Sequence, residues 1–507
     1  MTQPSRNSSG GQTKYIDRRS FLAGTAAASL TAALPPRIFS LPTPAQGSGT
    51  FPSGFFWGAS TAAAQVEGSP RADGGGESIW DVFLRTPHAT KDGSTNLVAD
   101  DEYHRWPEDV KLMQELGFNA YRFSISWPRV LPEGNGAVNS KGLDYYDRLI
   151  DALLAAKITP LVTTFHFDYP EALQKKGGWL NGDSPQWLAD YAHLLSSKFS
   201  DRVSHWLTIN EPNIYWAFGS EIGMMPPNQK LTDPELVRGS HNILLGHGKS
   251  VQAIRAGAKR PVKVSLAYAG ILTIPASDQA EDVTVARAAS FGVRKIPIIP
   301  GRPPMAMLST AWWLDPIYLG KYPEDGLKLF PDLSKIAGSE DMKTISQPLD
   351  FCGINLYFAP KMRAGANGAP EIVPDPPDVA RSHYGWAMTP EVLYWAPKFL
   401  YERYHQPIII TENGWSSEDK PAADGKVHDP QRAKFLDAYL KSFLRASQDG
   451  VPVEGYLHWS LLDNFEWGEG FGQQFGLIYV DHKTQKRIVK DSATHYKQII
   501  DSNGATL

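Results

Sequence analysis

Short strand-like runs alternate with helical patterns along most of this chain, and that alternation limits the possible folds more than any other feature. Each run is β-branched or aromatic, and each is followed by a segment whose apolar residues recur at helical spacing. Strand–helix–strand order favours parallel strands joined by helical crossovers. The sequence contains eight such runs, which predict an α/β fold with a single (β/α)8 barrel and elaborated βα loops. The runs are residues 55–59, 120–124, 160–165, 206–209, 262–266, 351–355, 407–412 and 455–459.

The length of 507 residues would allow two or three domains, but barrels often exceed ~250 residues as one unit. The sequence shows no internal repeat and no convincing linker. We therefore predict one barrel domain over residues 48–507. The largest insertion is residues 270–348. A run with Gly74, Gly75 and Gly76 lacks the spacing of a phosphate-binding loop, so a flexible loop at the barrel mouth is expected there.

Residues 1–47 do not resemble the barrel repeat. The pair Arg18-Arg19 precedes an uncharged, alanine-rich run that ends at Leu34, and a proline-rich stretch follows. This order resembles a twin-arginine export signal, and the apolar run of ~15 residues is too short to span a membrane. The alternative is a disordered tail with a chance arginine pair. We expect an export signal and disordered linker with cleavage near Ala45, no membrane anchor, and a periplasmic or secreted protein.

The charge and cysteine content exclude several other classes of protein. The formal net charge of −4 provides no basic surface for nucleic acid. The single cysteine, Cys352, lies in an apolar run and cannot form a disulfide within the chain, so it is expected to be an inert core residue. No metal-binding motif is present, and His241 and His247 are interpreted as ordinary helix residues. We expect neither a cofactor nor a metal.

Two glutamates stand directly after strand-like runs. Glu412 follows the run that starts at Pro407, and Glu211 follows the run that starts at Trp206, within Asn210-Glu211-Pro212. In a barrel, the residues at the carboxyl ends of the strands face the loop-lined mouth where active sites lie. Hydrolysis of a glycosidic bond uses two such carboxyl groups. The chain is therefore predicted to be a glycosidase.

Six blocks in order resemble glycoside hydrolase family 1, the β-glucosidase family, over roughly residues 51–500. They contain Phe-Phe-Trp-Gly-Ala, Tyr-Arg-Phe-Ser-Ile-Ser-Trp-Pro-Arg, Asn-Glu-Pro, Asp-Phe-Cys-Gly-Ile-Asn-Leu-Tyr, Ile-Thr-Glu-Asn-Gly and Trp-Ser-Leu-Leu-Asp-Asn-Phe-Glu-Trp. The resemblance implies a (β/α)8 barrel and hydrolysis that retains the anomeric configuration through a covalent glycosyl-enzyme.

The resemblance also assigns the catalytic roles. It makes Glu412 the nucleophile and Glu211 the acid/base. A retaining pair has its carboxyls ~5–5.5 Å apart, one ionised and one protonated. Arg122, Tyr357 and Asn355 are expected to support the nucleophile, the first two by favouring its charged form. Glu211 is expected to have a raised pKa that falls once Glu412 is esterified.

A sugar-binding set follows by the same resemblance. Glu466 would accept hydrogen bonds from O4 and O6 and repel a phosphate on O6, and Trp459 would form the floor under the ring. Trp386 matches an aromatic of the aglycone site, although a packing role is the alternative. His166 alone would more often be structural, but its place at a strand end favours a sugar contact. The residues expected to bind substrate are Gln65, His166, Asn210, Trp459, Glu466, Trp467 and Trp386.

The sequence departs from the family pattern in three places. Phe167 stands where a tryptophan is common, which removes an indole donor to the sugar and predicts a relaxed choice of glycone. The loop from Phe218 to Pro227 also differs, and Gln474 replaces a common arginine. These changes leave the aglycone preference open.

The function predicted is a retaining β-glucosidase that removes terminal non-reducing β-D-glucosyl residues from small glycosides. A transglycosidase would use the same residues and pass the sugar to an acceptor alcohol. A sugar-binding pseudoenzyme is a third possibility, but it would be expected to lack Glu211 or Glu412, and both are present. A small-molecule β-glycoside is thus the expected partner. The order of preference among glucose, galactose and fucose, the aglycone and the oligomeric state cannot be read from the sequence.

Overall fold

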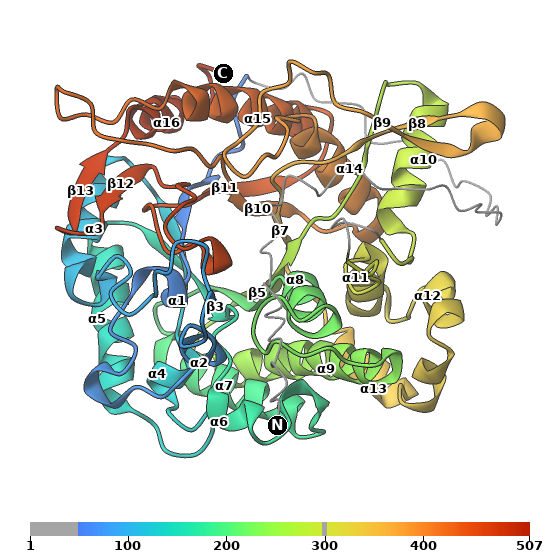
Figure 1. Ribbon diagram of the computed structural model, residues 1–507, viewed down its shortest axis with the longest axis horizontal. Helices are drawn as coiled ribbons and strands as arrows, with labels where there is room; N and C mark the ends of the chain where they lie inside the picture. The colour runs from blue at the N-terminus through green and yellow to red at the C-terminus, as the bar shows by residue number, and fades with distance from the viewer. Residues whose placement is uncertain (1–48, 297–301) are drawn as a thin grey trace, which may run out of the picture.

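A computed structural model describes residues 49–296 and 302–507 and confirms the (β/α)8 barrel (Figure 1). Eight parallel strands close the barrel in the order β1-β11-β10-β7-β5-β4-β3-β2. Each corresponds to one predicted run, with ends shifted by a few residues at most. The strands are β1 (Phe56–Ser60), β2 (Ala120–Ser124), β3 (Thr159–Phe165), β4 (His205–Asn210), β5 (Lys263–Ala269), β7 (Cys352–Asn355), β10 (Ile408–Asn413) and β11 (Val453–Trp459).

An apolar layer fills the inside of the barrel toward the amino ends of the strands. Seven buried side chains make one cluster there, and Phe56 of β1 packs against it. Neighbouring strands contribute the members, which is the layered packing expected of this fold. The polar side chains of the site lie beyond this layer, at the carboxyl ends of the strands. The cluster is Ala120, Leu161, Leu207, Ala267, Phe351, Ile409 and Leu457.

Long helices cover the outside of the barrel (Figure 1). Helix α9 begins well before the predicted segment 244–256, and Gly239 in this earlier part weakens the helical signal. Packing requires glycine along the helix: a Cβ on Gly239 would lie 2.0 Å from the Trp216 ring, and one on Gly248 would lie 2.0 Å from the Thr344 carbonyl oxygen. The helices are α3 (Glu102–Glu115), α5 (Ser140–Ala155), α7 (Ser184–Phe199), α9 (Asp233–Gly257), α14 (Val392–Tyr404), α15 (Pro430–Gln448) and α16 (Asp491–Asp501).

The insertion at 270–348 contains helices, as expected, and it also begins a small sheet that the sequence did not predict. Strand β6 (Ile274–Pro275) pairs with β8 (Lys361–Ala364), and β8 pairs with β9 (Pro370–Val373). A second unpredicted hairpin joins β12 (Ile478–Asp481) to β13 (Lys486–Val489). The helices of the insertion are α10 (Ala280–Phe291), α11 (Thr310–Leu319), α12 (Glu324–Leu329) and α13 (Ser339–Ile345).

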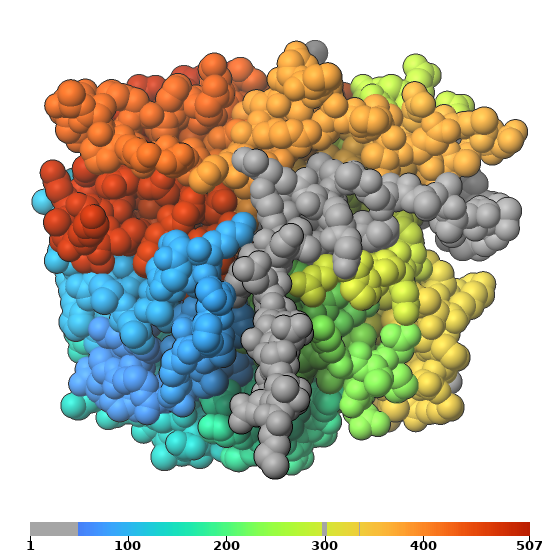
Figure 2. All heavy atoms as spheres, viewed as in Figure 1, coloured from blue at the N-terminus to red at the C-terminus, as the bar shows by residue number. Residues whose placement is uncertain are grey.

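Short helices occupy several loops at the carboxyl ends of the strands. In the space-filling view, the insertion (yellow) lies on the right, and the last third of the chain (orange and red) lies along the top and left (Figure 2). The last barrel strand, β11, pairs with the first, β1, and this pairing closes the barrel. The short helices are α1 (Ala63–Val66), α2 (Ile79–Phe83), α4 (Trp127–Val130), α6 (Glu171–Gln174) and α8 (Pro212–Trp216).

The prediction of a flexible loop at the glycine run was wrong. Gly75 and Gly76 are buried, and the Gly76 amide donates to the Pro128 carbonyl oxygen at 2.8 Å. A Cβ on Gly76 would lie 2.1 Å from the Pro132 carbonyl oxygen. These glycines allow two backbone segments to pack closely.

Two predictions concern membranes and the N-terminus. Within the part of the chain that the structure describes, no helix is both long and apolar enough to cross a membrane. The predicted export signal and linker, residues 1–47, lie outside the described residues. The predicted domain boundary there stays a prediction.

Candidate active site

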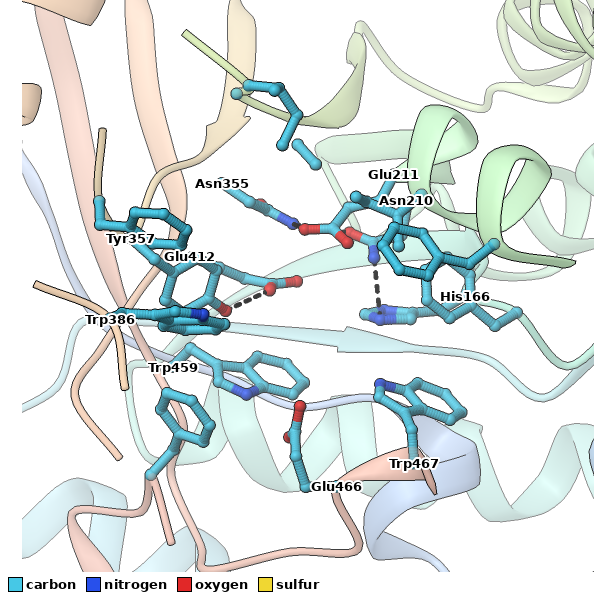
Figure 3. Close-up of a pocket in the computed structure, with 18 of the residues that line it drawn as sticks. His166, Asn210, Glu211, Asn355, Tyr357, Trp386, Glu412, Trp459, Glu466 and Trp467 are labelled. Atoms are coloured by element: carbon cyan, nitrogen blue, oxygen red, sulfur yellow. Dashed lines mark hydrogen bonds between the residues drawn. The ribbon is translucent and has the colours of Figure 1, made fainter. Parts of the chain in front are cut away.

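A pocket opens at the carboxyl ends of the barrel strands and gathers most of the predicted site residues (Figure 3). It encloses about 1000 Å³, counting its open mouth. Two predicted residues, Arg122 and Gln65, are fully buried beneath it. The predicted residues that line it are His166, Asn210, Glu211, Asn355, Tyr357, Trp386, Glu412, Trp459, Glu466 and Trp467.

Glu412 ends β10 and is held by two donors, one on each carboxylate oxygen. Arg122 Nη1 donates to Oε1 at 2.7 Å, and the Tyr357 hydroxyl donates to Oε2 at 2.7 Å. Burial raises the pKa of Glu412 above its ordinary value, while Arg122, Tyr357 and Asn355 lower it. The predicted neighbours therefore favour the charged form, as expected, but their task is to offset the cost of burying a carboxylate.

Arg122 also fixes the position of the residue before Glu211. Its Nη2 donates to Asn210 Oδ1 at 2.6 Å, and its Nε donates to Thr163 Oγ1 at 3.0 Å. Tyr357 is buried among carboxylates, which raises its pKa well above the ordinary value and keeps its hydroxyl as a donor. One buried guanidinium thus connects the ends of β2, β3, β4 and β10.

Glu211 lies at the end of β4, half-buried at the first turn of α8. Its φ of 43° is in the left-handed region, and its amide donates to the Ala267 carbonyl oxygen at 2.7 Å. The pairing of β4 with β5 shifts register just before it. This local irregularity turns the side chain into the pocket instead of continuing the pleat of the strand.

Asn355 contacts the acid/base candidate as well as supporting the nucleophile candidate. Its Nδ2 donates to Glu211 Oε1 at 2.8 Å, and its side chain lowers the pKa of Glu412. Its Oδ1 accepts from Thr411 Oγ1 at 2.6 Å, which fixes the orientation of the amide. The sequence placed Asn355 among the residues that support Glu412, and the structure adds a direct contact with Glu211.

His166 and Asn210 both line the pocket and form a hydrogen-bonded pair. Asn210 Oδ1 accepts from Arg122, so its Nδ2 is the atom that donates to His166 Nε2 at 2.9 Å. Burial and the charge of Arg122 hold the pKa of His166 well below its ordinary value, so the ring is neutral. Nε2 therefore accepts, and the proton resides on Nδ1.

Gln65 lies behind Glu466 and holds it in place. Gln65 Nε2 donates to the Phe465 carbonyl oxygen at 2.9 Å and to Glu466 Oε2 at 3.3 Å. Gln65 Oε1 has no hydrogen-bond partner among the described residues. An acceptor therefore remains available beside Glu466, but a direct contact between Gln65 and a sugar stays a prediction.

Aromatic rings surround this polar group. His166 stacks against Trp459 and Trp467 with ring centroids 6.0 and 6.1 Å apart. Phe167 lines the pocket, with its ring centroid 5.2 Å from that of Trp467. Trp386 stacks on Tyr384 at 4.6 Å with an interplanar angle of 4°. Trp386 both packs and lines the pocket, so the two readings of this residue are compatible.

Most of the apolar part of the pocket wall was not predicted from the sequence. Phe218 and Met225 belong to the unusual loop after β4, and Phe475 follows Gln474, so these three lie in segments that departed from the family pattern. Ile271 and Leu272 carry no motif, and only their place after a barrel strand could have indicated them. The apolar side chains that were missed are Ile214, Phe218, Met225, Ile271, Leu272, Phe358, Pro360 and Phe475.

Three residues outside the pocket lie where the sequence placed them, Cys352 in the core and His241 and His247 on a helix. Cys352 is buried and its thiol is free. His247 and His241 lie on α9, where they contact Thr208 Oγ1 and the Tyr322 hydroxyl. Across residues 49–296 and 302–507, no group of three or more His, Cys, Asp or Glu side chains is arranged to hold a metal ion.

Comparison with known proteins matches the chain to the family model "Glycosyl hydrolase family 1" over residues 47–505. A 1,4-beta-D-glucan glucohydrolase of Thermotoga neapolitana is 42% identical over 458 residues, which cover 90% of this chain and 99% of that protein. Beta-glucosidase A of Thermotoga maritima is 41% identical and covers 90% and 98%. The solved structure of the Thermotoga maritima beta-glucosidase in complex with glucoimidazole superposes with a TM-score of 0.81, covering 90% of this chain and 100% of that chain.

Proposed function

The chain belongs to glycosyl hydrolase family 1, and we propose that it hydrolyses terminal β-D-glucosyl residues from small glycosides by double displacement. One observation carries the proposal. A buried carboxylate held by a guanidinium and a phenol shares the pocket with a second, half-buried carboxyl group. Retaining glycosidases need this difference in environment, because one group must attack while the other gives up a proton. The two groups are Glu412 and Glu211.

In the first step, the Glu412 carboxylate attacks the anomeric carbon as the bond to the leaving oxygen breaks. Glu211 gives its proton to that oxygen, so the aglycone departs as an alcohol. Arg122 and Tyr357 each donate a short hydrogen bond to one carboxylate oxygen of Glu412. These two bonds limit the motion of the attacking group. The product of this step is a glycosyl ester on Glu412.

In the second step, Glu211 takes a proton from water as the water oxygen attacks the anomeric carbon. The ester bond breaks and Glu412 leaves as a carboxylate, which Arg122 and Tyr357 again stabilise. Each step inverts the anomeric carbon, so the overall configuration is retained. Asn355, which donates to Glu211, is placed to keep that carboxyl group aimed at the reacting centre in both steps.

The proposed glycone is an unphosphorylated sugar. Glu466 lines the pocket as a buried side chain, and Gln65 fixes its orientation. A carboxylate there accepts hydrogen bonds from sugar hydroxyls and repels a phosphate group. Relatives named as beta-glucosidases support glucose as the sugar. Phe167 is the reason to include β-galactosides and β-fucosides in the first panel.

The test is hydrolysis of nitrophenyl β-glucoside, with the first-formed anomer followed by NMR. The proposal predicts β-glucose as the first product, and it predicts rate losses of roughly 10³-fold or more for Glu211→Gln and Glu412→Gln. An acceptor alcohol in a parallel sample measures the share of transglycosylation. First-formed α-glucose, or a variant as active as the wild type, would contradict the proposed roles.

We also propose that the enzyme is exported through its twin-arginine-type N-terminus. The support is the sequence alone: Arg18-Arg19, the short apolar run that follows and the proline-rich stretch. Fractionation of cells expressing the full chain tests it. Replacing Arg18 and Arg19 together by lysine should retain activity in the cytoplasm, and equal export of the variant would refute the proposal.

A further inference from the structure

The pocket divides into a polar part and an apolar part, and the division follows the order of the strands. The polar residues around Glu466 and Trp459 come from β11 and the loop after it, and His166 follows β3. The apolar residues come from loops after three strands that are neighbours in the barrel, β4, β5 and β7. From these loops come Ile214, Phe218 and Met225 after β4, Ile271 and Leu272 after β5, and Phe358 and Pro360 after β7.

Glu211 stands on the apolar side of this division. It ends β4, the strand whose loop supplies Ile214, Phe218 and Met225. In the close-up, Glu211 and Glu466 lie on opposite sides of Glu412 (Figure 3). An acid that protonates the leaving oxygen must lie on the side of the leaving group. The apolar loops therefore border the space that the aglycone occupies.

The apolar wall is fixed by its own backbone contacts. The Met224 and Met225 amides donate to the Phe218 carbonyl oxygen at 2.7 and 3.3 Å. The half-buried Glu221 carboxyl group accepts from the Ala306 and Met307 amides at 2.8 and 3.1 Å, which ties the same loop to the insertion. A wall held in this way is preformed, so little ordering is needed when a ligand binds.

Several side chains of this wall are only partly buried. Ile214, Met225, Ile271, Phe358 and Trp386 are each of intermediate exposure. Large apolar side chains that remain exposed beside a reacting centre gain from covering by an apolar group. Among the described residues that line this sector, none is charged apart from Glu211 and Glu412 at its base.

From this arrangement we infer that the aglycone is an apolar group, an alkyl chain or an aromatic ring system, rather than a second sugar. The inference rests on the proposed function. Apart from the Trp386 indole N–H, a sugar in this place would set its hydroxyl groups against alkyl and phenyl side chains that can neither donate nor accept. Unpaired polar groups in a desolvated site weaken binding. An apolar aglycone covers the same side chains at no such cost.

A series of n-alkyl β-glucosides tests the inference, because their alcohols leave with nearly equal ease and differ mainly in buried surface. We expect kcat/KM to rise about fourfold for each methylene from butyl to octyl, the gain from burying one CH2 group. Octyl glucoside should exceed cellobiose. The paired variant Met225→Gln with Ile271→Thr should flatten the series. Leu154→Gln, on the partly exposed outer face of α5, is the matched control.

Calorimetry with methyl and octyl β-thioglucosides measures binding without turnover. Tighter binding and a more negative heat-capacity change for the octyl compound would support the inference. Hydrolysis of methyl glucoside with no gain along the alkyl series, or a preference for cellobiose, would overturn it and leave the proposed function standing. Chain-length-dependent binding without hydrolysis of any β-glucoside would overturn the proposed function and leave the apolar site standing.

Discussion

Tyr357→Phe removes one of the two donors that hold Glu412 and leaves the other in place. The phenol hydroxyl donates to Glu412 Oε2 at 2.7 Å, while Arg122 donates to Oε1. A hydrogen bond to a charged group contributes about 1.5–3 kcal/mol, and one pKa unit corresponds to about 1.4 kcal/mol. Since the bond favours the carboxylate, losing it should raise the pKa of Glu412 by about one to two units.

A protonated Glu412 cannot attack, so the acid limb of the pH profile of kcat/KM should move to higher pH by the same amount. The acid limb of kcat/KM reports the ionisation of the attacking carboxylate in the free enzyme. Nitrophenyl β-glucoside is the substrate for the assay. Tyr191→Phe is the control, because Tyr191 is buried and donates only to the Ile125 carbonyl oxygen at 2.9 Å. An acid limb that stays in place, or moves to lower pH, would refute the reasoning.

Two further predictions concern the glycone and the stability of the fold. Glu466→Ser should lower kcat/KM for nitrophenyl β-glucoside about 10- to 150-fold through the loss of a charge-assisted hydrogen bond. The same variant should raise activity on nitrophenyl β-glucoside 6-phosphate. An unchanged ratio between the two substrates would argue against Glu466 as the discriminating residue. Burial raises the pKa of Glu102 to about 8, so its stabilising protonated form is present below about pH 4.5 and lost as pH rises toward 8. In urea titrations, Glu102→Gln should therefore lose less free energy of unfolding between pH 5 and 8 than the wild type, by about 3 kcal/mol. The exposed Glu108→Gln on the same helix is the control, and parallel pH dependences for both variants and wild type would exclude this role.

Much of the fold could be predicted because it depends on local patterns. Eight strands buried on both faces appear in the sequence as continuous apolar runs, and their order restricts the topology to few choices. The two small sheets could not be predicted in the same way. Strand β6 has two residues and pairs with β8 far along the chain, and β9 has only four residues, so no periodicity distinguishes either from a loop.

The polar part of the site could be predicted because its residues stand at strand ends, within motifs. Glu412, Glu211 and His166 each follow a run that reads as a strand. The apolar wall depends instead on how long loops pack, as with Ile271 and Leu272, and sequence spacing does not determine that packing. The sequence could not show that burial raises the pKa of Glu412 against the lowering effect of its neighbours, because the extent of burial is known only from the three-dimensional structure.

The assignment of Glu412 and Glu211 is tested most directly by adding azide to the two alanine variants and determining the anomer of the glucosyl azide. Without the nucleophile, azide attacks nitrophenyl β-glucoside from the vacated face, so Glu412→Ala should yield the α-azide. Without the acid/base, the glycosyl ester still forms and azide opens it, so Glu211→Ala should yield the β-azide. The reverse pattern, or the same anomer from both variants, would contradict the assignment.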